Sequence, residues 1–389
     1  MALHRWVRII APQPTRPPRF HYLVQSIELS YVIAPRRSGR AMVRNPLMTL
    51  LQAVRDHGSI SAAARAVGLS YRHVWGELKR WEETLGHPLV VSEQGQRAHL
   101  SEFGDKLLWA ERQAQARLAP QIEALHAELE RAFAVAFDPR THVLSLQASH
   151  DDALALLRTQ AASERLQLDI QFTGSVDAIR ALNQGRCVMA GFHTLERPPR
   201  GSLAQRTYQP LLKPGQHKLI GFARRTQGLI VATGNPLALR TLGDVVQRRA
   251  RYVNRAIGTG TRLLFDELLA DAALAPDAVE GHDRVEPSHA AVAHAVASGE
   301  AEAGLGLESA ARAAGLGFVP LVAERYHLAC LKDALKQPAI KALITVLRGA
   351  QWQHLLGTLP GYESVASGEV QSLSALLPWW TFKDRKPAA

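Results

Sequence analysis

The residues from 253 to 262, VNRAIGTGTR, bring together groups that can bind an anion. The stretch lies between an apolar run typical of a strand and a run typical of a helix. At such a junction, backbone N–H groups, hydroxyls and a guanidinium can converge on an anion at the helix N-terminus. A polar turn with Arg262 in solvent is the alternative, because short Gly and Thr loops are common turn chemistry. The candidate ligand-binding residues are Asn254, Arg255, Thr259, Gly260, Thr261 and Arg262.

Three earlier junctions have the same chemical character, in QASHDDALALL, FTGSVDAIRALNQG and GFHTLE. Each places hydroxyl or imidazole groups where a strand-like run ends. A serine at one helix start is usually only a cap. Four polar junctions in step with strand–helix alternation nevertheless predict one shared anion site. The candidates that these three junctions add are Ser149, His150, Thr173, Ser175 and His193.

Two stretches nearer the C-terminus add Ser288, His289 and Tyr326 to the ligand-binding candidates. Ser288 and His289 open a helix-like run, where His289 either binds ligand or serves as a capping or solvent-exposed residue. Tyr326, in ERYHLACL, either offers its phenol to the ligand or belongs to the core. No metal site is predicted, because the remaining histidines lack the spacing of metal ligands beside a carboxylate.

The elements that must position these residues alternate between strands and helices. Strand-like runs begin near residues 142, 166, 187, 218, 228 and 251, with helical patterns between most of them. This alternation predicts an α/β fold with mostly parallel strands, whose ligands gather at strand C-termini and helix N-termini.

A separate helical module precedes the α/β part. PLMTLLQAVRDHG has apolar residues at helical spacing and a glycine stop, and SISAAARAVGLSYRHVWGELKRWEETLG follows it. Ser61 is predicted to cap a short Ala-rich helix, Gly68 and Leu69 to form a tight turn, and Ser70 to cap a second helix. This spacing predicts a helix-turn-helix.

The second helix of this module has a basic face opposite an apolar stripe. At 100° per residue, Val74, Leu78, Trp81 and Leu85 fall together as the buried side. Arginine and lysine on the other side suit guanine and phosphate contacts, although a solvated basic face is the alternative. HPLVVSEQGQRAHLS then predicts a β-hairpin, which makes the module a winged helix. The candidate DNA-binding residues are Ser70, Tyr71, Arg72, His73, Gly76, Lys79, Arg80 and Arg97.

A long helix is predicted after the hairpin, from a cap at Ser101 to about residue 133. Leu118, Ile122, Leu125, Leu129 and Phe133 recur close to a heptad seam, with Pro120 interrupting the run. The seam either pairs two chains or packs on its own winged domain. We favour pairing, which predicts a homodimer or a higher homo-oligomer.

The whole chain has the length of two or three domains, with 389 residues. It has neither an apolar stretch that could span a membrane nor a signal-peptide pattern, so no membrane association and a cytoplasmic location are expected. Its two cysteines, Cys187 and Cys330, form no metal-spaced pair and fit a reducing compartment. We find no nucleophile elbow, phosphate loop or dinucleotide fingerprint, so we expect no enzyme and no cofactor.

The net charge of +11 is unevenly distributed. Residues 1–44 contain eight arginines and a single acidic residue, Glu28. This leader is either a basic DNA-binding arm or an extension upstream of a start at Met42.

Residues 46–104 resemble the DNA-binding domain of LysR-type regulators, and LSYRHVWGELKRWE is especially similar to molybdate-responsive regulators of the ModE type. Residues 143–350 resemble type II periplasmic substrate-binding proteins in ASHDDALALL, GSVDAIRALNQGRCVMAGFHTL, GNPLALRTLGDVV, VNRAIGTGTRLLFDELL and HAAVAHAVASGEAEAGLGLESAA. The second resemblance implies two α/β lobes around a ligand cleft. It places the crossing strands in FARRTQGLIVATGNP and between Phe318 and Leu331, and Ser288 and His289 on a helix that faces the cleft.

The expected organisation is a basic leader (1–43), a winged helix-turn-helix (44–101), a linker helix (102–138), a binding-protein-like domain (141–377) and a tail (378–389). The expected function is a one-component regulator that binds double-stranded DNA and a small anionic effector. The resemblance points to molybdate, tungstate or a molybdenum-cofactor-related molecule, whereas Arg255 and Arg262 would also suit a carboxylate or a phosphorylated ligand. A cytoplasmic binding or cofactor-biosynthesis protein, with the winged helix making protein contacts, is the competing expectation.

Overall fold

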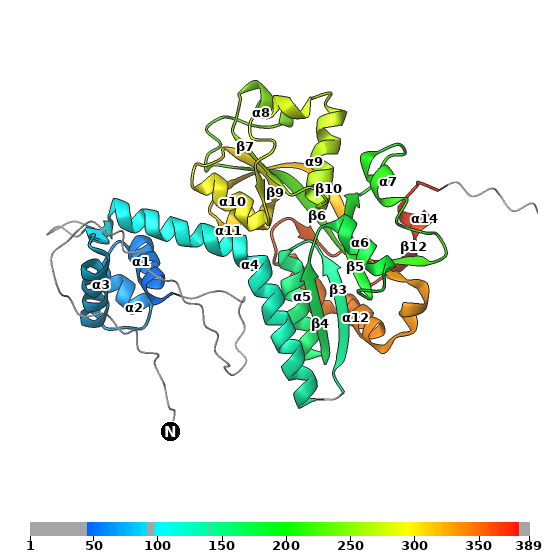
Figure 1. The fold of residues 1–389 in the computed structure, drawn as a ribbon, viewed down its shortest axis with the longest axis horizontal. Coiled ribbons are helices and arrows are strands. Elements are labelled where there is room, and N and C mark those ends of the chain that lie inside the picture. Colours follow the sequence, from blue (N-terminus) through cyan, green and yellow to red (C-terminus); the bar gives the residue numbers. More distant parts are fainter. Residues whose placement is uncertain (1–44, 92–96, 139, 381–389) are drawn as a thin grey trace, which may run out of the picture. The chain divides into compact units, whose positions relative to one another are not determined.

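The computed structural model of the chain describes residues 45–91, 97–138 and 140–380 (Figure 1). The basic leader expected at residues 1–43 and the hairpin tip at 92–96 lie outside the described residues. Among the described residues, no helix is both long enough and apolar enough to cross a membrane.

The N-terminal module has the predicted winged-helix elements. They are α1 (Pro46–His57), α2 (Ile60–Ala66), α3 (Tyr71–Leu85), β1 (Val90–Val91) and β2 (His99–Leu100), the last two paired antiparallel. Gly58 ends α1 in the left-handed conformation, and the Ser70 hydroxyl accepts a hydrogen bond from the backbone N–H of His73 at the start of α3. The prediction of Ser61 as a cap is wrong. The cap of α2 is Ser59, whose hydroxyl accepts from the backbone N–H of Ala62, because the helix begins at Ile60.

Apolar side chains from all three helices and the hairpin form the core of this module. Leu51 and Val54 from α1 meet Ala63 of α2 and Val74 and Leu78 of α3. Trp81 and Leu85, predicted on the buried stripe, pack only partly buried against this core. Ala63 and Ala64 of α2 are buried in this core, and their small size lets the helices approach closely.

The linker helix α4 (Glu102–Phe137) begins at the predicted cap, Ser101, and is 36 residues long. It continues through Pro120 and past the expected end near residue 133. Proline removes one backbone hydrogen bond but does not have to end a helix that is packed elsewhere.

The C-terminal part is the predicted α/β domain with two lobes (Figure 1). The elements of lobe 1 before the first crossing strand are β3 (His142–Ala148), α5 (Asp152–Ser163), β4 (Leu166–Phe172), α6 (Ser175–Asn183), β5 (Met189–Leu195) and α7 (Leu203–Tyr208). Those of lobe 2 are α8 (Leu242–Gln247), β7 (Tyr252–Arg255), α9 (Gly260–Asp271), the 3-10 turn Pro276–Ala278, β8 (Val285–Glu286), α10 (His289–Ala297), β9 (Ala303–Leu307) and α11 (Glu308–Ala313).

Two long strands cross between the lobes, β6 (His217–Val231) and β10 (Gly317–Leu331). The strand order is β4-β3-β5-β10-β6-β9-β7-β8. Neighbours within each lobe are parallel, whereas the crossing strands are antiparallel to each other and to the lobe strands beside them. The two strand-like runs near 218 and 228 are therefore one strand. Both crossings lie where the resemblance placed them.

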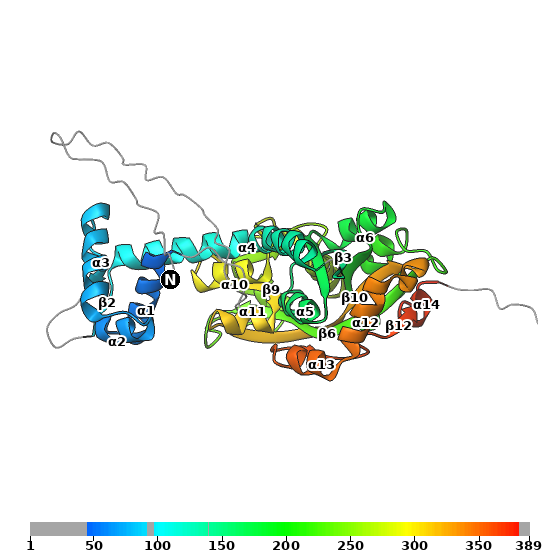
Figure 2. The same cartoon turned by 90° about the horizontal axis from the view of Figure 1, so that it is seen from below.

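The chain returns to lobe 1 after β10. The returning elements are the 3-10 turn Lys332–Lys336, α12 (Pro338–Arg348), α13 (Ala350–Gly357), β11 (Tyr362–Glu363), β12 (Val370–Ser372) and α14 (Leu373–Leu376). Figure 2 shows α4 on one side of lobe 1 and α12 with α13 on the other. Trp379 is buried in the lobe 1 core, so the folded domain extends beyond the expected end at residue 377.

Candidate functional site

A buried arginine, Arg225 of the crossing strand β6, holds together a cluster of charged residues in the C-terminal domain. Its guanidinium donates to the carboxylates of Asp151 and Glu324, the latter from Nε at 2.5 Å. Its Nη2 lies 3.1 Å from Nδ1 of His193. Although burial opposes it, the two carboxylates raise the pKa of Arg225. The ion cluster therefore fixes one guanidinium between lobe 1 and the crossing strands.

A second buried arginine, Arg255 at the end of β7, has no carboxylate hydrogen-bonded to it among the described residues. Its Nη2 donates to the backbone carbonyl of Pro287 at 2.9 Å, and its Nε has no hydrogen-bond partner. Burial and the nearby Arg225 lower the pKa of Arg255 to about 10, against a smaller opposing effect of Asp151. A buried guanidinium that still carries its charge near neutral pH needs an anion beside it.

Two histidines from opposite lobes complete the polar cluster. His193 of β5 and His289 of α10 are buried. Burial, together with the Arg225 and Arg255 guanidinium groups, holds the pKa of each imidazole well below its usual value. Both rings are consequently neutral at pH 7, so they can donate or accept hydrogen bonds without adding charge.

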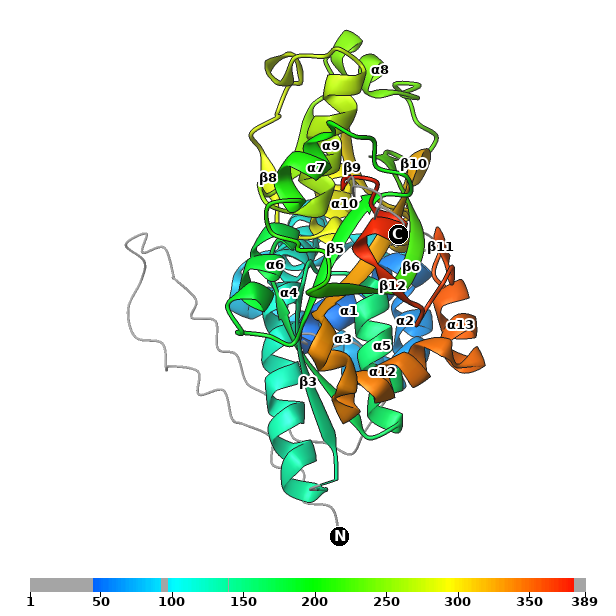
Figure 3. The ribbon, with the colours of Figure 1, turned by 90° about the vertical axis from the view of Figure 1, so that its right-hand side faces the viewer.

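The two lobes touch at helix N-termini. A Cβ atom on Gly174, the cap of α6, would lie 2.6 Å from the Gly258 carbonyl oxygen, and one on Gly260 would lie 2.7 Å from the His193 ring. Figure 3 shows α7 of lobe 1 beside α9 of lobe 2. Side chains at Gly174 and Gly260 would hold the lobes apart, so glycine permits this close approach.

Several buried polar atoms in this region lack a hydrogen-bond partner within the described chain. They include Ser149 Oγ, Arg255 Nε, His289 Nδ1 and Tyr326 OH. Tyr326 packs against both His193, with ring centroids 4.0 Å apart, and the Arg225 guanidinium. Because buried polar groups are normally hydrogen-bonded, these atoms are candidate contacts for a polar ligand at the interface of the lobes.

Most of the predicted ligand-binding residues lie at this interface. Thr261 Oγ1 accepts from Gln227 Nε2 at 3.0 Å and lies 3.5 Å from His289 Nε2. Ser175 is fully buried at the start of α6, and Thr173 is half-buried beside it. His150 is buried two residues after the end of β3, where it bonds to the linker helix.

Four predicted ligand-binding residues, Asn254, Thr259, Arg262 and Ser288, use their polar groups elsewhere. The Thr259 hydroxyl caps α9, and the Ser288 hydroxyl caps α10 and donates to the Ala116 carbonyl. Asn254 bonds to the backbone N–H of Arg255 and to the His282 carbonyl.

Arg262 is the clearest departure from the predicted anion loop. Its Nε donates to Asp266 at 2.9 Å, and its Nη2 lies 2.8 Å from His282. Its side chain is therefore neither in solvent nor in the buried cluster. In the described structure, Arg225 and Arg255 supply the guanidinium groups of the site.

Sequence reasoning missed Asp151, Arg225, Gln227 and Glu324. Arg225 and Gln227 alternate with the less buried Arg224 and Thr226 along β6, so polar residues at every second position of a crossing strand were the available signal. The partners of Arg225 could not be read from the sequence, because they lie 74 and 99 residues away.

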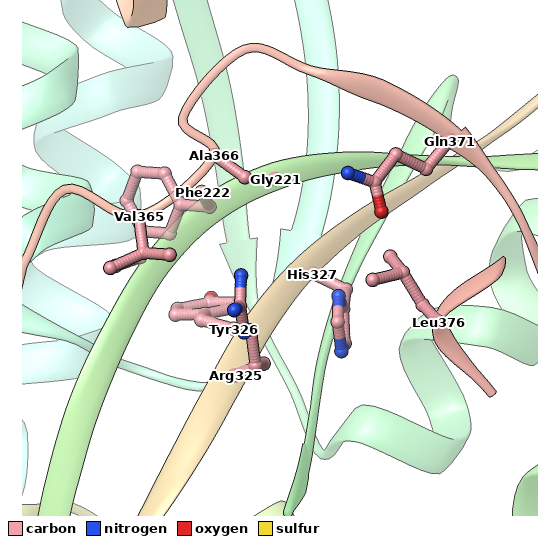
Figure 4. Close-up of a pocket in the computed structure, with 10 residues that line it drawn as sticks. Gly221, Phe222, Arg325, Tyr326, His327, Val365, Ala366, Gln371 and Leu376 are labelled. Atoms are coloured by element: carbon pink, nitrogen blue, oxygen red, sulfur yellow. The ribbon is translucent and has the colours of Figure 1, made fainter. Parts of the chain in front are cut away.

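A small cavity lies on the crossing strands beside the C-terminal segment (Figure 4). Its volume is about 10 Å³, and residues such as Gly221, Phe222, Tyr326 and Ala366 line it. A space of this size holds at most one water molecule. It is too small for an effector.

The candidate DNA-binding face lies on α3. Tyr71, Arg72, His73 and Gly76 are exposed, and Ser70 caps the helix. Arg97 is also exposed, at the hairpin. The exposed Trp75 was missed in the sequence, although the same helical wheel places it between Tyr71 and Lys79.

Lys79 and Arg80 are exposed but paired within the helix. Lys79 Nζ lies 2.6 Å from Glu82 Oε2, and Arg80 pairs with Glu77. Exposed pairs of this kind are weak, so both cations can exchange partners for phosphate. Arg72 has no ion pair among the described residues and presents its whole charge.

A helix-turn-helix followed by a two-lobed binding domain defines a class of ligand-responsive DNA-binding proteins. Residues 47–105 match the family described as bacterial regulatory helix-turn-helix protein, lysR family, and residues 157–348 match the PBP superfamily domain. The chain is thus similar to the first family over its N-terminal module and to the second over much of its C-terminal domain. The matches agree with the expectation of a regulator rather than an enzyme.

Several known proteins are similar to parts of the chain. The uncharacterized protein YvgK of Bacillus subtilis (strain 168) is 30% identical over 200 residues, covering 51% of this chain and 64% of YvgK, which is less than two thirds of its length. The molybdenum-pterin-binding protein MopA of Rhodobacter capsulatus is 35% identical over 77 residues, covering 19% of this chain and 29% of MopA. The crystal structure of full-length BenM aligns with 81% of this chain and 98% of that one at 15% identity, with a TM-score of 0.41.

Proposed function

We propose that the protein is a one-component transcriptional regulator whose winged helix binds double-stranded DNA and whose two-lobed domain senses a small anion. The observation that carries the ligand class is the buried Arg255 guanidinium, which has, among the residues that the structure describes, no hydrogen-bonded carboxylate and no partner for its Nε. The regulator would act in the cytoplasm, where its DNA is.

The favoured effector is molybdate, tungstate or a molybdenum-cofactor-related molecule. The site offers hydrogen bonds with little added charge. They come from neutral His193 and His289, from the Thr261 hydroxyl and from helix N-termini of both lobes. Such a donor set suits an oxyanion held mainly by hydrogen bonds. The similarity of a short part of the chain to a molybdenum-pterin-binding protein supports the same class.

The regulator is proposed to be a homodimer, or a higher homo-oligomer, paired through α4. On this helix Leu118, Leu125 and Phe133 of the predicted seam are exposed. Two paired chains would place their recognition helices about one DNA turn, roughly 34 Å, apart. A ligand can alter DNA binding only if it favours one arrangement of the lobes over another.

The proposal is tested by titrating the full chain with sodium molybdate, tungstate, sulfate and phosphate in a calorimeter. We expect molybdate or tungstate to bind and Arg255→Met to weaken binding at least about tenfold, because it removes the unneutralised charge. Arg240→Met, at an exposed position, is the matched control. Binding that is equal in the Arg255→Met variant and the control would contradict the assignment of the site.

The DNA-binding half of the proposal is tested by a gel shift with the DNA upstream of the protein's own gene, with and without molybdate. A shift that molybdate alters is expected. The competing function, a binding or cofactor-biosynthesis protein that uses the winged helix for protein contacts, predicts no shift under either condition.

A further inference from the structure

One face of the linker helix α4 is buried against the C-terminal domain. Ala116, Pro120, Glu123 and Ala127 are buried, and their spacing of three and four residues puts them on one side of the helix. Leu118 and Leu125 lie on the exposed side. A carboxylate in the middle of a buried helix face requires a specific partner.

The partner of Glu123 belongs to the ligand site in lobe 1. Glu123 Oε2 lies 3.1 Å from Nε2 of His150, and both side chains are buried. Arg158 Nη1 also donates to the Glu123 backbone carbonyl at 3.1 Å. His150 follows Ser149 at the end of β3 and is close enough to His289 to affect its pKa. The His150 ring packs against Phe172, with centroids 4.9 Å apart.

The same helix also holds lobe 2. Ser288 Oγ, which caps α10, donates to the Ala116 carbonyl at 3.1 Å. The Arg117 guanidinium donates two hydrogen bonds to the Glu286 carboxylate, from Nη2 at 2.6 Å and from Nε at 3.0 Å. Ser288 immediately precedes His289 of the cleft. About two turns of α4 thus separate the contact to lobe 2 at Ala116 from the contact to His150 of lobe 1 at Glu123.

We infer that α4 contributes a positioning residue, Glu123, to the ligand site, and that α4 reports the relative position of the lobes through its contacts with His150 and Ser288. The inference rests on the proposed function, because it takes the buried cluster as the effector site. Glu123 fixes the orientation of the His150 ring. A movement of one lobe relative to the other must then break or remake a contact of α4, because the helix is bonded to both.

The first experiment needs no ligand. Amide hydrogen exchange is measured on the full chain as wild type, Glu123→Ala, Glu123→Gln and Glu128→Ala, the last an exposed glutamate of the same helix. Glu123→Ala is expected to speed exchange at residues 149–153 about tenfold or more, because it removes a buried hydrogen bond. Glu123→Gln keeps an acceptor and should restore most of the protection, and Glu128→Ala should match wild type. Unchanged exchange at 149–153 in Glu123→Ala would overturn the positioning role.

The second experiment repeats the exchange with sodium molybdate. In wild type, we expect slower exchange both at residues 256–262 and in the segment 113–127 of α4. Glu123→Ala should bind molybdate roughly tenfold more weakly and, at saturating molybdate, lose the response in α4 while keeping that at 256–262.

The two proposals fail in different ways. A wild-type response at 256–262 with none in α4 would refute the role of the helix and leave the effector site standing. A wild type that responds to molybdate nowhere would refute molybdate as effector, and the ligand-free comparison would then decide the role of Glu123.

Discussion

At the scale of single residues, the site is built around two buried arginines with different surroundings. Arg225 is neutralised by Asp151 and Glu324, whereas Arg255 finds only a backbone carbonyl as partner within the described parts of the chain. The carboxylates hold Arg225 in place as part of the protein structure. In the proposed function, the charge of Arg255 is the one that binds the anion.

Replacement of Arg225 tests whether this residue stabilises the folded protein. Arg225→Met would leave Asp151 and Glu324 buried without their counter-charge, so we expect the free energy of unfolding to fall by about 3–5 kcal/mol. Urea unfolding followed by circular dichroism measures it. Arg240→Met, on the surface, should change stability by less than about 0.5 kcal/mol. A similar small change in both variants would show that the ion cluster is not needed for folding.

The buried histidines predict how stability depends on pH. Burial, with help from the Arg325 charge, lowers the pKa of His327 from 6.5 to about 3. The unfolded chain therefore takes up the proton first as the pH falls below 6.5. The stability that the neutral ring provides is complete above pH 6.5 and is lost as the pH falls toward 3.

As the pH falls from 7 to 5, the lowered pKa of His327 should by itself reduce the free energy of unfolding by about 2 kcal/mol. His327→Gln can still bond to Thr194, whose hydroxyl lies 3.1 Å from the ring, but it does not titrate. Urea unfolding at pH 7, 6 and 5 should give a flatter pH profile for this variant, with the other histidines of lowered pKa, His193, His217, His289 and His294, contributing to the remaining slope. Parallel profiles for the two proteins would contradict the neutral state of His327.

At the scale of elements, α3 carries two kinds of basic residue. Arg72 has no ion pair among the described residues, whereas Lys79 and Arg80 are paired with glutamates of the same helix. We expect Arg72→Ala to weaken binding to the specific DNA site by about 1–3 kcal/mol and to relax its sequence preference. Lys79→Ala should weaken specific and non-specific DNA alike and reduce the salt slope by about 1. Fluorescence anisotropy at several salt concentrations measures both.

Molybdate titration provides the control for the Arg72 prediction, since ligand binding should not change in Arg72→Ala. Equal loss of DNA and molybdate binding in a folded Arg72→Ala protein would indicate general damage rather than a lost base contact.

The other element with a testable surface is α4, whose two sides differ in burial. Leu125 is 57% exposed on the side opposite Glu123. Leu125→Glu would place like charges against each other in a pair of helices, so we expect the dimer dissociation constant to rise at least about tenfold. Sedimentation equilibrium measures it, with Glu128→Gln as the control. An unchanged dimer would place the pairing surface elsewhere.

At the scale of the whole molecule, effector and DNA must affect each other equally if the protein works as proposed. If molybdate changes the affinity for the upstream DNA by some factor, saturating DNA must change the affinity for molybdate by the same factor. Couplings of this kind are typically about 5–150-fold. Calorimetry with and without DNA, compared with anisotropy with and without molybdate, tests this equality. Binding of both ligands with no mutual effect would leave a DNA-binding protein with an unconnected anion site.

The local elements could be predicted from the sequence. Helix periodicity, the caps at Ser70 and Ser101 and the glycine stop at Gly58 depend on residues a few positions apart, which is the range over which these signals act. The polar junctions also follow from local order, because each strand end and helix start carries its own residues. Even here a two-residue error remained, since either Ser59 or Ser61 satisfies the capping preference.

The sequence by itself determined the winged helix, the linker helix, the α/β alternation and the polar strand ends. Only the tertiary structure decided which polar groups meet: Arg225 with Asp151 and Glu324, Glu123 with His150, and Arg262 with Asp266 and His282 instead of the cluster. The physical reason is that backbone preferences are set by neighbouring residues, whereas the cluster depends on strand order and register, which bring distant residues together.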